Sequence, residues 1–195
     1  MDLNRRQFLN GVTRALGAGA ALIIVNGASL SSAFAYQRNV DNRKSKLLNR
    51  AQLQTLAQIC QTIIPKTDTP GAADLDCHGF IDHQLQVVYG KSQQQAIVEV
   101  LGGVEEYCYG QYQLSFTQLQ PLQQTECLQD LERGAWGEAQ IQEQFAFLKS
   151  LNAFAYFTSE VGATQVLNYQ AVPGGYQGSI PFTADTKNYG SRAFY

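Results

Sequence analysis

The sequence lacks the short motifs that most often mark a catalytic or cofactor-binding chain. It has no G-x-G-x-x-G after a predicted strand, no P-loop and no G-x-S-x-G around a serine nucleophile. Its cysteines never occur as C-x-x-C or C-x-x-C-H, so zinc and c-type haem have no ligand spacing to use. The residues therefore argue against a nucleotide, zinc, haem or other redox cofactor bound by this chain itself.

Positive charge is also scarce over most of the chain. Residues 51–195 contain 6 Lys and Arg against 14 Asp and Glu. Nucleic-acid binding needs a basic face on the folded part, so this charge balance excludes that class of function. We interpret residues 36–49 as a solvated basic linker, with contact to anionic lipid or to an acidic partner as the alternative. The basic residues of this region are Arg38, Arg43, Lys44, Lys46 and the adjoining Arg50.

The first 35 residues have the features of an export signal. A pair of arginines precedes a small, weakly apolar stretch, and an A-x-A pattern closes it. The segment resembles a bacterial twin-arginine (Tat) signal, which is read by a receptor and predicts a periplasmic protein. A membrane-spanning helix is the alternative, disfavoured by Arg14, Asn26 and several glycines and serines. The signal residues are Arg5, Arg6, Phe8 and Leu9, and the predicted cleavage residues are Ala33 and Ala35.

The four cysteines all follow the signal. An even number of cysteines in an exported protein favours disulfides, and four allow three connectivities. The shortest loops result from pairing Cys60 with Cys77 and Cys108 with Cys127. Free buried thiols are the alternative.

Helical periodicity dominates residues 50–160, and no alternating strand pattern extends beyond a few residues. A capping box of Asn49 and Gln52 begins the first helix, Pro65 ends it, and a second box of Ser92 and Gln95 begins the third. We therefore predict an all-α domain, a small bundle of about five helices, followed by a long irregular tail. The predicted helices cover about 50–64, 73–89, 92–110, 121–134 and 138–159, and the tail covers 161–195.

One pair of polar residues suggests chemistry. His78 and Asp82 are four residues apart on a predicted helix, so the carboxylate could orient the imidazole as a general base. His83 lies about 140° around the helix from His78, which is unsuitable for a shared metal ion. The favoured interpretation is an ordinary helix with surface polar groups, in which Asp74 and Asp76 suit the positive end of the helix dipole.

The tail is rich in aromatic residues, glycine and proline and shows no helical period. Aromatic side chains supply large contact areas and are enriched in protein interfaces. We expect the tail to contact a partner; packing back over its own helices is the alternative, and residues 158–164 should be partly intramolecular. The predicted interface residues are Tyr156, Phe157, Tyr169, Pro173, Tyr176 and Phe182.

Two stretches resemble signatures of the gluconate 2-dehydrogenase subunit 3 family. They are LAQICQTIIPKTDTPGA at 56–72 and FTSEVGATQVLNYQAVPGGYQG at 157–178. The resemblance implies a non-catalytic small subunit of a periplasmic FAD-dependent dehydrogenase of sugars or sugar acids. It implies a large flavoprotein partner of the glucose–methanol–choline (GMC) type that holds FAD, and a cytochrome c acceptor with haem c on a third subunit or a soluble carrier instead. It further implies that this chain carries the export signal for the flavoprotein and helps it mature.

Two other functions stay open at this point. One is a stand-alone periplasmic enzyme that uses His78 and Asp82. The other is a structural protein held at the membrane by an uncleaved leader.

Overall fold

The computed structural model describes residues 47–167 and four later positions, 179, 181, 183 and 186. Within these residues the protein has five α-helices, two short helical turns and no strand, which confirms the predicted all-α class. The α-helices are α3 (Arg50–Ile63), α4 (Cys77–Val87), α5 (Lys91–Tyr112), α6 (Pro121–Arg133) and α7 (Ala139–Thr158). The 3₁₀ turn η1 (Phe116–Gln118) precedes α6, and the π-helical turn η2 (Gly162–Val166) follows α7.

Several predictions fall outside the described residues. These are the export signal (Arg5, Arg6, Phe8, Leu9), its cleavage residues (Ala33, Ala35) and four of the six predicted interface residues (Tyr169, Pro173, Tyr176, Phe182).

Helix ends follow local chemistry, with two differences from the prediction. The capping box of α3 is present: Gln52 N donates to Asn49 Oδ1 at 2.9 Å, and Asn49 N donates to Gln52 Oε1 at 3.0 Å. In contrast, α5 begins after Gly90, so Ser92 lies inside the helix and does not cap it. Helix α4 begins at Cys77 rather than near Ala73, because Asp76 adopts a left-handed conformation with φ of 58°.

Apolar residues recur at helical spacing along the predicted helices, and these stripes form a single buried core. Most stripe residues are buried, whereas Val88 is 63% exposed and Ile63 and Ile141 are half-buried. Phe116 in η1 is fully buried, although it lies between the predicted helices, in a stretch for which no helix was expected. The buried stripe residues are Leu53, Leu56, Cys60, Cys77, Ile81, Leu85, Ile97, Val100, Leu101, Val104, Cys108, Gln124, Cys127, Leu128, Leu131, Phe145, Leu148, Leu151 and Ala155.

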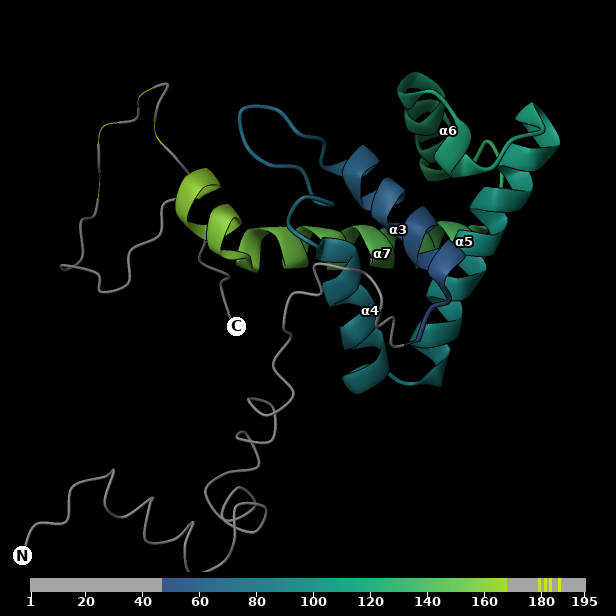
Figure 1. Cartoon of the computed structure of the whole chain (residues 1–195), viewed down its shortest axis with the longest axis horizontal. Coiled ribbons are helices and arrows are strands. Elements are labelled where there is room, and N and C mark those ends of the chain that lie inside the picture. Colours follow the sequence, from purple (N-terminus) through teal and green to yellow (C-terminus); the bar gives the residue numbers. More distant parts are fainter. Residues whose placement is uncertain (1–46, 168–178, 180, 182, 184–185, 187–195) are drawn as a thin grey trace, which may run out of the picture. The chain divides into compact units, whose positions relative to one another are not determined.

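Helix α7 is central to the packing. It contacts α5 and α4 most extensively, and Figure 1 shows it passing across α3 and α4. Its buried Asn152 donates a hydrogen bond from Nδ2 to the carbonyl oxygen of Cys60 in α3 at 3.3 Å. None of the helices among the described residues has both the length and the apolar character needed to cross a bilayer.

Candidate interaction surface

The loop at 64–76, between α3 and α4, projects beyond the two helices in Figure 1. Its base is closed by a hydrogen bond from Ala72 N to Ile64 O at 3.0 Å. Nearer its tip, Thr67 N donates to Thr69 O at 3.1 Å, and Gly71 N donates to the Asp74 carboxylate at 3.1 Å. Residues 65–68 at the tip are exposed. The loop is therefore an exposed segment with a hydrogen-bonded backbone.

Helix α3 fixes the second half of this loop through Gln61. The Gln61 Oε1 atom accepts a hydrogen bond from Ala73 N at 2.9 Å. Gly71 lies directly against the same side chain, and a Cβ there would overlap the amide, 2.7 Å from Gln61 Cδ. Glycine allows this close approach, which gives a physical reason for the Pro-Gly-Ala sequence in the loop.

Tyr156 of α7 ties the loop to the end of the helical domain. Its hydroxyl donates to Pro70 O at 2.9 Å and lies 3.2 Å from Thr69 Oγ1. Its side chain is only 3% exposed. This corrects one sequence-based prediction: Tyr156 makes intramolecular contacts under the loop and does not present a partner-facing ring. The contact ties the first stretch that carries the family resemblance (56–72) to the residue directly before the second (157–178), 86 residues apart in sequence.

Aromatic residues continue outward from this contact. The Phe157 ring meets the Tyr156 ring edge-on, with centroids 5.3 Å apart, and is 39% exposed. Phe154, one turn earlier on the same face, is 43% exposed, and its ring centroid lies 6.0 Å from that of Phe80 in α4. We name the exposed loop tip (65–68) together with Phe154 and Phe157 the loop–aromatic surface. Its mixture of aromatic and polar groups is typical of protein interfaces.

The backbone bends at Ser159, where the conformation is extended, and then continues into the helical turn η2. Ser159 Oγ donates to Tyr156 O at 2.6 Å and accepts from Gly162 N at 3.0 Å. Leu167 N donates to Gly162 O at 3.0 Å, which closes the π-helical turn η2. Residues 162–166, predicted as the start of an irregular tail, are thus helical and pack on α7, and the expected intramolecular contacts of 158–164 are present.

The polar groups near His78 are buried, contrary to the prediction of a polar surface. His78 is 4% and Asp82 2% exposed. Asp82 Oδ1 accepts hydrogen bonds from Leu47 N at 3.0 Å and Leu48 N at 2.8 Å, while His78 Nε2 lies 3.3 Å from Asp76 Oδ1. Burial lowers the pKa of His78, against the opposite influence of Asp76 and Asp82. Asp82 therefore fastens the start of the domain to α4.

The four cysteines are buried free thiols in the structure, so the predicted disulfides Cys60–Cys77 and Cys108–Cys127 are not formed in it. The Sγ atoms of Cys108 and Cys127 nevertheless lie 3.6 Å apart. Burial raises the pKa of Cys60, and it raises the pKa of Cys77 to about 12, so both stay protonated near neutral pH. Among the described residues no group of three or more His, Cys, Asp or Glu is placed to hold a metal ion.

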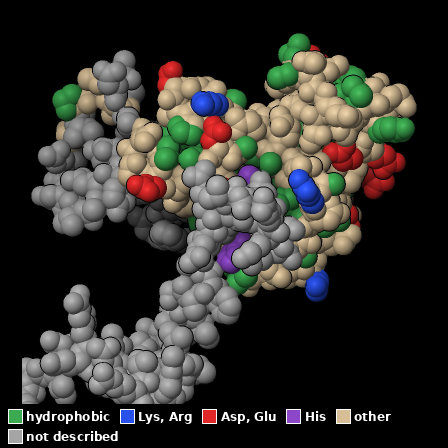
Figure 2. Space-filling model, viewed as in Figure 1, with side chains coloured by type: hydrophobic (Ala, Val, Ile, Leu, Met, Phe, Trp, Pro, Cys, Tyr) green, Lys and Arg blue, Asp and Glu red, His purple; other side chains and the backbone are tan. Residues whose placement is uncertain are grey.

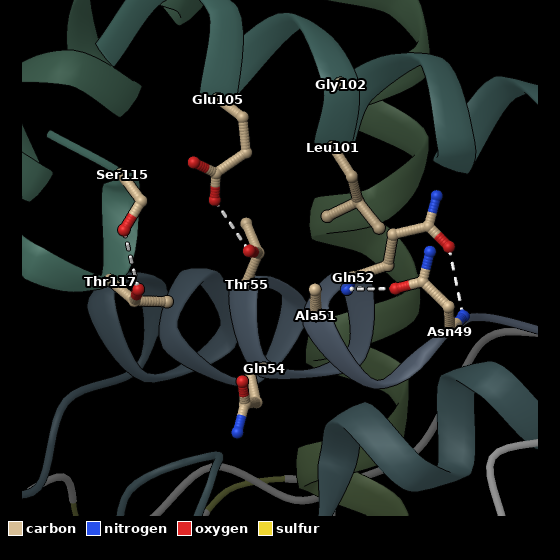
Figure 3. A pocket seen from close by; sticks show the side chains of 10 residues that line it. All are labelled: Asn49, Ala51, Gln52, Gln54, Thr55, Leu101, Gly102, Glu105, Ser115 and Thr117. Carbon is tan, nitrogen blue, oxygen red and sulfur yellow. Dashed lines mark hydrogen bonds between the residues drawn. The ribbon is translucent and has the colours of Figure 1, made fainter. Parts of the chain in front are cut away.

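An open depression of about 290 Å³ lies between the start of α3, α5 and η1 (Figure 3). Glu105 is its one acidic group, and both carboxylate oxygens are engaged within the chain. Thr55 Oγ1 donates to one at 2.6 Å, and Phe116 N donates to the other at 3.1 Å. The remaining lining is small or uncharged, so the geometry assigns this carboxylate to holding η1 against α3 and α5.

Other apolar side chains are exposed far from the loop in sequence. Figure 2 shows hydrophobic side chains over α6 and the end of α5, with acidic side chains over α5. Tyr109, Leu114 and Leu122 are 63%, 42% and 70% exposed, respectively. They provide a matched control surface for the loop–aromatic surface.

The sequence did not indicate which residues hold the loop at 64–76 in place. Gln61 and Pro70 each act through a contact with a residue distant in the chain, which periodicity does not reveal. The only available signal was the P-G-A sequence itself, because such a run predicts a tight turn with close backbone approach.

A family model described as Gluconate 2-dehydrogenase subunit 3 matches residues 50–174, which include the five helices, the loop at 64–76 and η2. Comparison with curated proteins and with solved structures gives no match. The match covers well over half of the chain, and the chain therefore belongs to the gluconate 2-dehydrogenase subunit 3 family.

Proposed function

We propose that this chain is the non-catalytic small subunit of a periplasmic FAD-dependent dehydrogenase that oxidises a sugar or sugar acid. FAD would be held by a large GMC-type flavoprotein partner, and a cytochrome c subunit with haem c would accept the electrons. The small subunit would carry the Tat signal for the complex and support folding and stability of the flavoprotein. Family membership supports the assignment to a dehydrogenase complex.

The observation that carries the proposal is the hydrogen bond that joins the first family-like stretch to the residue directly before the second. Tyr156 connects the loop at 64–76 to the end of α7 through its hydrogen bond to Pro70. A loop held by Gln61 and Tyr156 has already lost much of its conformational freedom, so docking a partner there costs little ordering entropy. The adjoining Phe154 and Phe157 offer aromatic contact area.

Export of the flavoprotein by this chain is tested by changing Arg5 and Arg6 to Lys together. We expect the flavoprotein to remain in the cytoplasm, because the paired arginines are the feature that the Tat receptor would read. The matched control changes Arg38 and Arg43 to Lys, which alters a second basic pair outside the leader. Unchanged periplasmic dehydrogenase activity in the Arg5/Arg6 variant would reject the export role.

The stand-alone enzyme remains the second candidate because His78 and Asp82 are brought into one buried cluster. Dehydrogenase activity of the intact complex carrying His78→Ala separates the two functions. The proposed small-subunit role predicts that turnover per assembled flavoprotein is unchanged. A loss of turnover without loss of assembly would favour chemistry at His78.

A further inference from the structure

Two buried cysteines from different helices lie in contact. Cys108 belongs to α5 and Cys127 to α6, and they are 0% and 1% exposed. Their Sγ atoms are 3.6 Å apart, although the residues are 19 positions apart in sequence. An S–S bond of about 2.05 Å would need the two sulfur atoms to approach by roughly 1.5 Å. A small shift of α6 against α5, or of the two side chains, would achieve this.

Trp136 lies beside the cysteine pair and contacts both helices. Trp136 covers Cys127 from the chain that follows α6, and its Nε1 donates to Cys127 O at 2.9 Å. The Trp136 ring stacks on the Tyr107 ring of α5, with centroids 4.4 Å apart and an interplanar angle of 9°. The indole therefore joins α5 to the end of α6 beside the cysteine pair.

Either sulfur of the pair can donate the hydrogen bond to the other. A thiolate on one cysteine would therefore accept a hydrogen bond from the thiol of its neighbour, which stabilises it. A thiolate is the attacking species in thiol–disulfide exchange.

We propose that Cys108 and Cys127 are a dithiol that closes into a disulfide between α5 and α6 when the chain meets a small-molecule disulfide oxidant such as oxidised glutathione. The thiolate of one cysteine attacks one sulfur of the oxidant, which forms a mixed disulfide and releases one glutathione thiolate. The thiolate of the other cysteine then attacks the Sγ atom of the first, forms the intramolecular bond and releases the second glutathione thiolate. The two cysteines together lose two electrons and two protons, and the oxidant is reduced to two thiols.

Burial sets the rate of this reaction. An oxidant reaches either cysteine only when α6 separates locally from α5, because neither sulfur is accessible in the closed state. We therefore expect slow oxidation of the folded chain and much faster oxidation during refolding. The proposal is independent of the export role and of the flavoprotein partner.

Trypsin separates the possible connectivities in the purified full-length chain after incubation with oxidised glutathione and alkylation without reduction. Cleavage after Arg50, Lys66, Lys91 and Arg133 places Cys60, Cys77 and the Cys108–Cys127 pair in three different peptides. We expect peptide 92–133 to carry no alkyl group, to be lighter than its reduced form by two hydrogens, and to gain two alkyl groups after reduction. Two alkyl groups or two glutathione adducts on this peptide, or a crosslink from it to 51–66 or 67–91, would overturn the proposal.

Stability and fluorescence give a second measurement on the same samples. Reduction of the oxidised wild-type chain should lower its Tm by roughly 5–10 °C, because the loop that the bond closes regains its freedom in the unfolded state. Emission of Trp136, the chain's single tryptophan, should rise on reduction, since the adjacent disulfide quenches the indole. The Cys108→Ser and Cys127→Ser variants should show neither change. An equal response to reductant in these variants would also overturn the proposal.

Discussion

At the scale of single residues, Gly162 has the tightest steric constraint at the end of α7. A Cβ at this position would overlap Tyr156 O and lie 2.8 Å from the Tyr156 carbonyl carbon, and backbone atoms cannot move aside as a side chain can. We expect Gly162→Ala to lower the free energy of unfolding by about 1–3 kcal/mol. Gly102→Ala is the control: it adds a methyl group within α5 where nothing lies within 4 Å, so it should stabilise by about 0.5–1 kcal/mol. Urea denaturation measures both, and equal effects would contradict the steric argument.

His78 gives the domain a pH dependence of stability. Burial, the largest cause, lowers its pKa below the ordinary 6.5, so the unfolded chain takes up this proton more readily than the folded chain. The contribution of His78 to stability is therefore present above about pH 6.5 and is lost as the pH falls toward the lowered pKa. Urea midpoints between about pH 7.5 and 5.5 should fall more steeply for the wild type than for His78→Gln. Parallel pH profiles would show that His78 does not contribute in this way.

At the scale of elements, the loop at 64–76 depends on α7 for its position. Tyr156→Phe removes the hydroxyl that donates to Pro70 O while keeping the buried ring. We expect a loss of about 0.5–1.5 kcal/mol in the free energy of unfolding and faster hydrogen exchange at loop amides. Tyr109→Phe alters a hydroxyl on a side chain that is 63% exposed and should change stability by less than about 0.5 kcal/mol. Unchanged loop exchange in Tyr156→Phe would show that other contacts suffice to hold the loop.

Among the features of single elements, helix positions, buried faces and one helix cap could be predicted from the sequence. Helix positions and buried faces followed from periodicity, as with Leu53, Leu56 and Cys60 on α3, because burial repeats with the helical turn. The cap at Asn49 could also be predicted, since Asn49 and its partner Gln52 lie within four residues of each other. The cap expected at Ser92 was wrong, because α5 begins one residue earlier. The start of α4 was not predicted correctly, because Asp76 adopts a left-handed conformation and no glycine at this position indicates one.

Contacts between residues far apart in the sequence could not be predicted from periodicity or local capping patterns. The Asp82 carboxylate accepts backbone hydrogen bonds from Leu47 and Leu48, which precede it by more than 30 positions. Tyr156 matched the residue type of an interface aromatic, but its hydroxyl had an acceptor in a loop 86 residues away. The loop residues and Phe157 of the candidate surface were therefore indicated by the two family-like stretches, whereas Phe154, which lies in neither stretch, and the arrangement of these residues were not.

At the scale of the whole molecule, two exposed apolar regions compete as docking sites for a catalytic partner. The loop–aromatic surface includes residues 65–68 of the first family-like stretch and Phe157 of the second. The region at Tyr109, Leu114 and Leu122 is at least as exposed and also lies within the matched residues, but it includes neither stretch. Exposure alone would thus favour the second region, whereas the presence of both stretches favours the first.

A pair of matched variants decides between these regions. Phe157→Ser removes an aromatic ring that is 39% exposed, and Leu122→Ser removes an apolar side chain that is 70% exposed. Aromatic anchors of an interface typically contribute 2 kcal/mol or more, so we expect Phe157→Ser to weaken binding of the proposed flavoprotein partner by roughly tenfold or more. Leu122→Ser should leave the affinity within about twofold, because a side chain outside the interface affects neither partner. Binding is measured with purified partner chains, and thermal unfolding of each variant establishes that the domain is intact. The reverse ranking, with Leu122→Ser the weaker binder, would move the docking site to α5 and α6 and leave the loop at 64–76 as a purely structural feature.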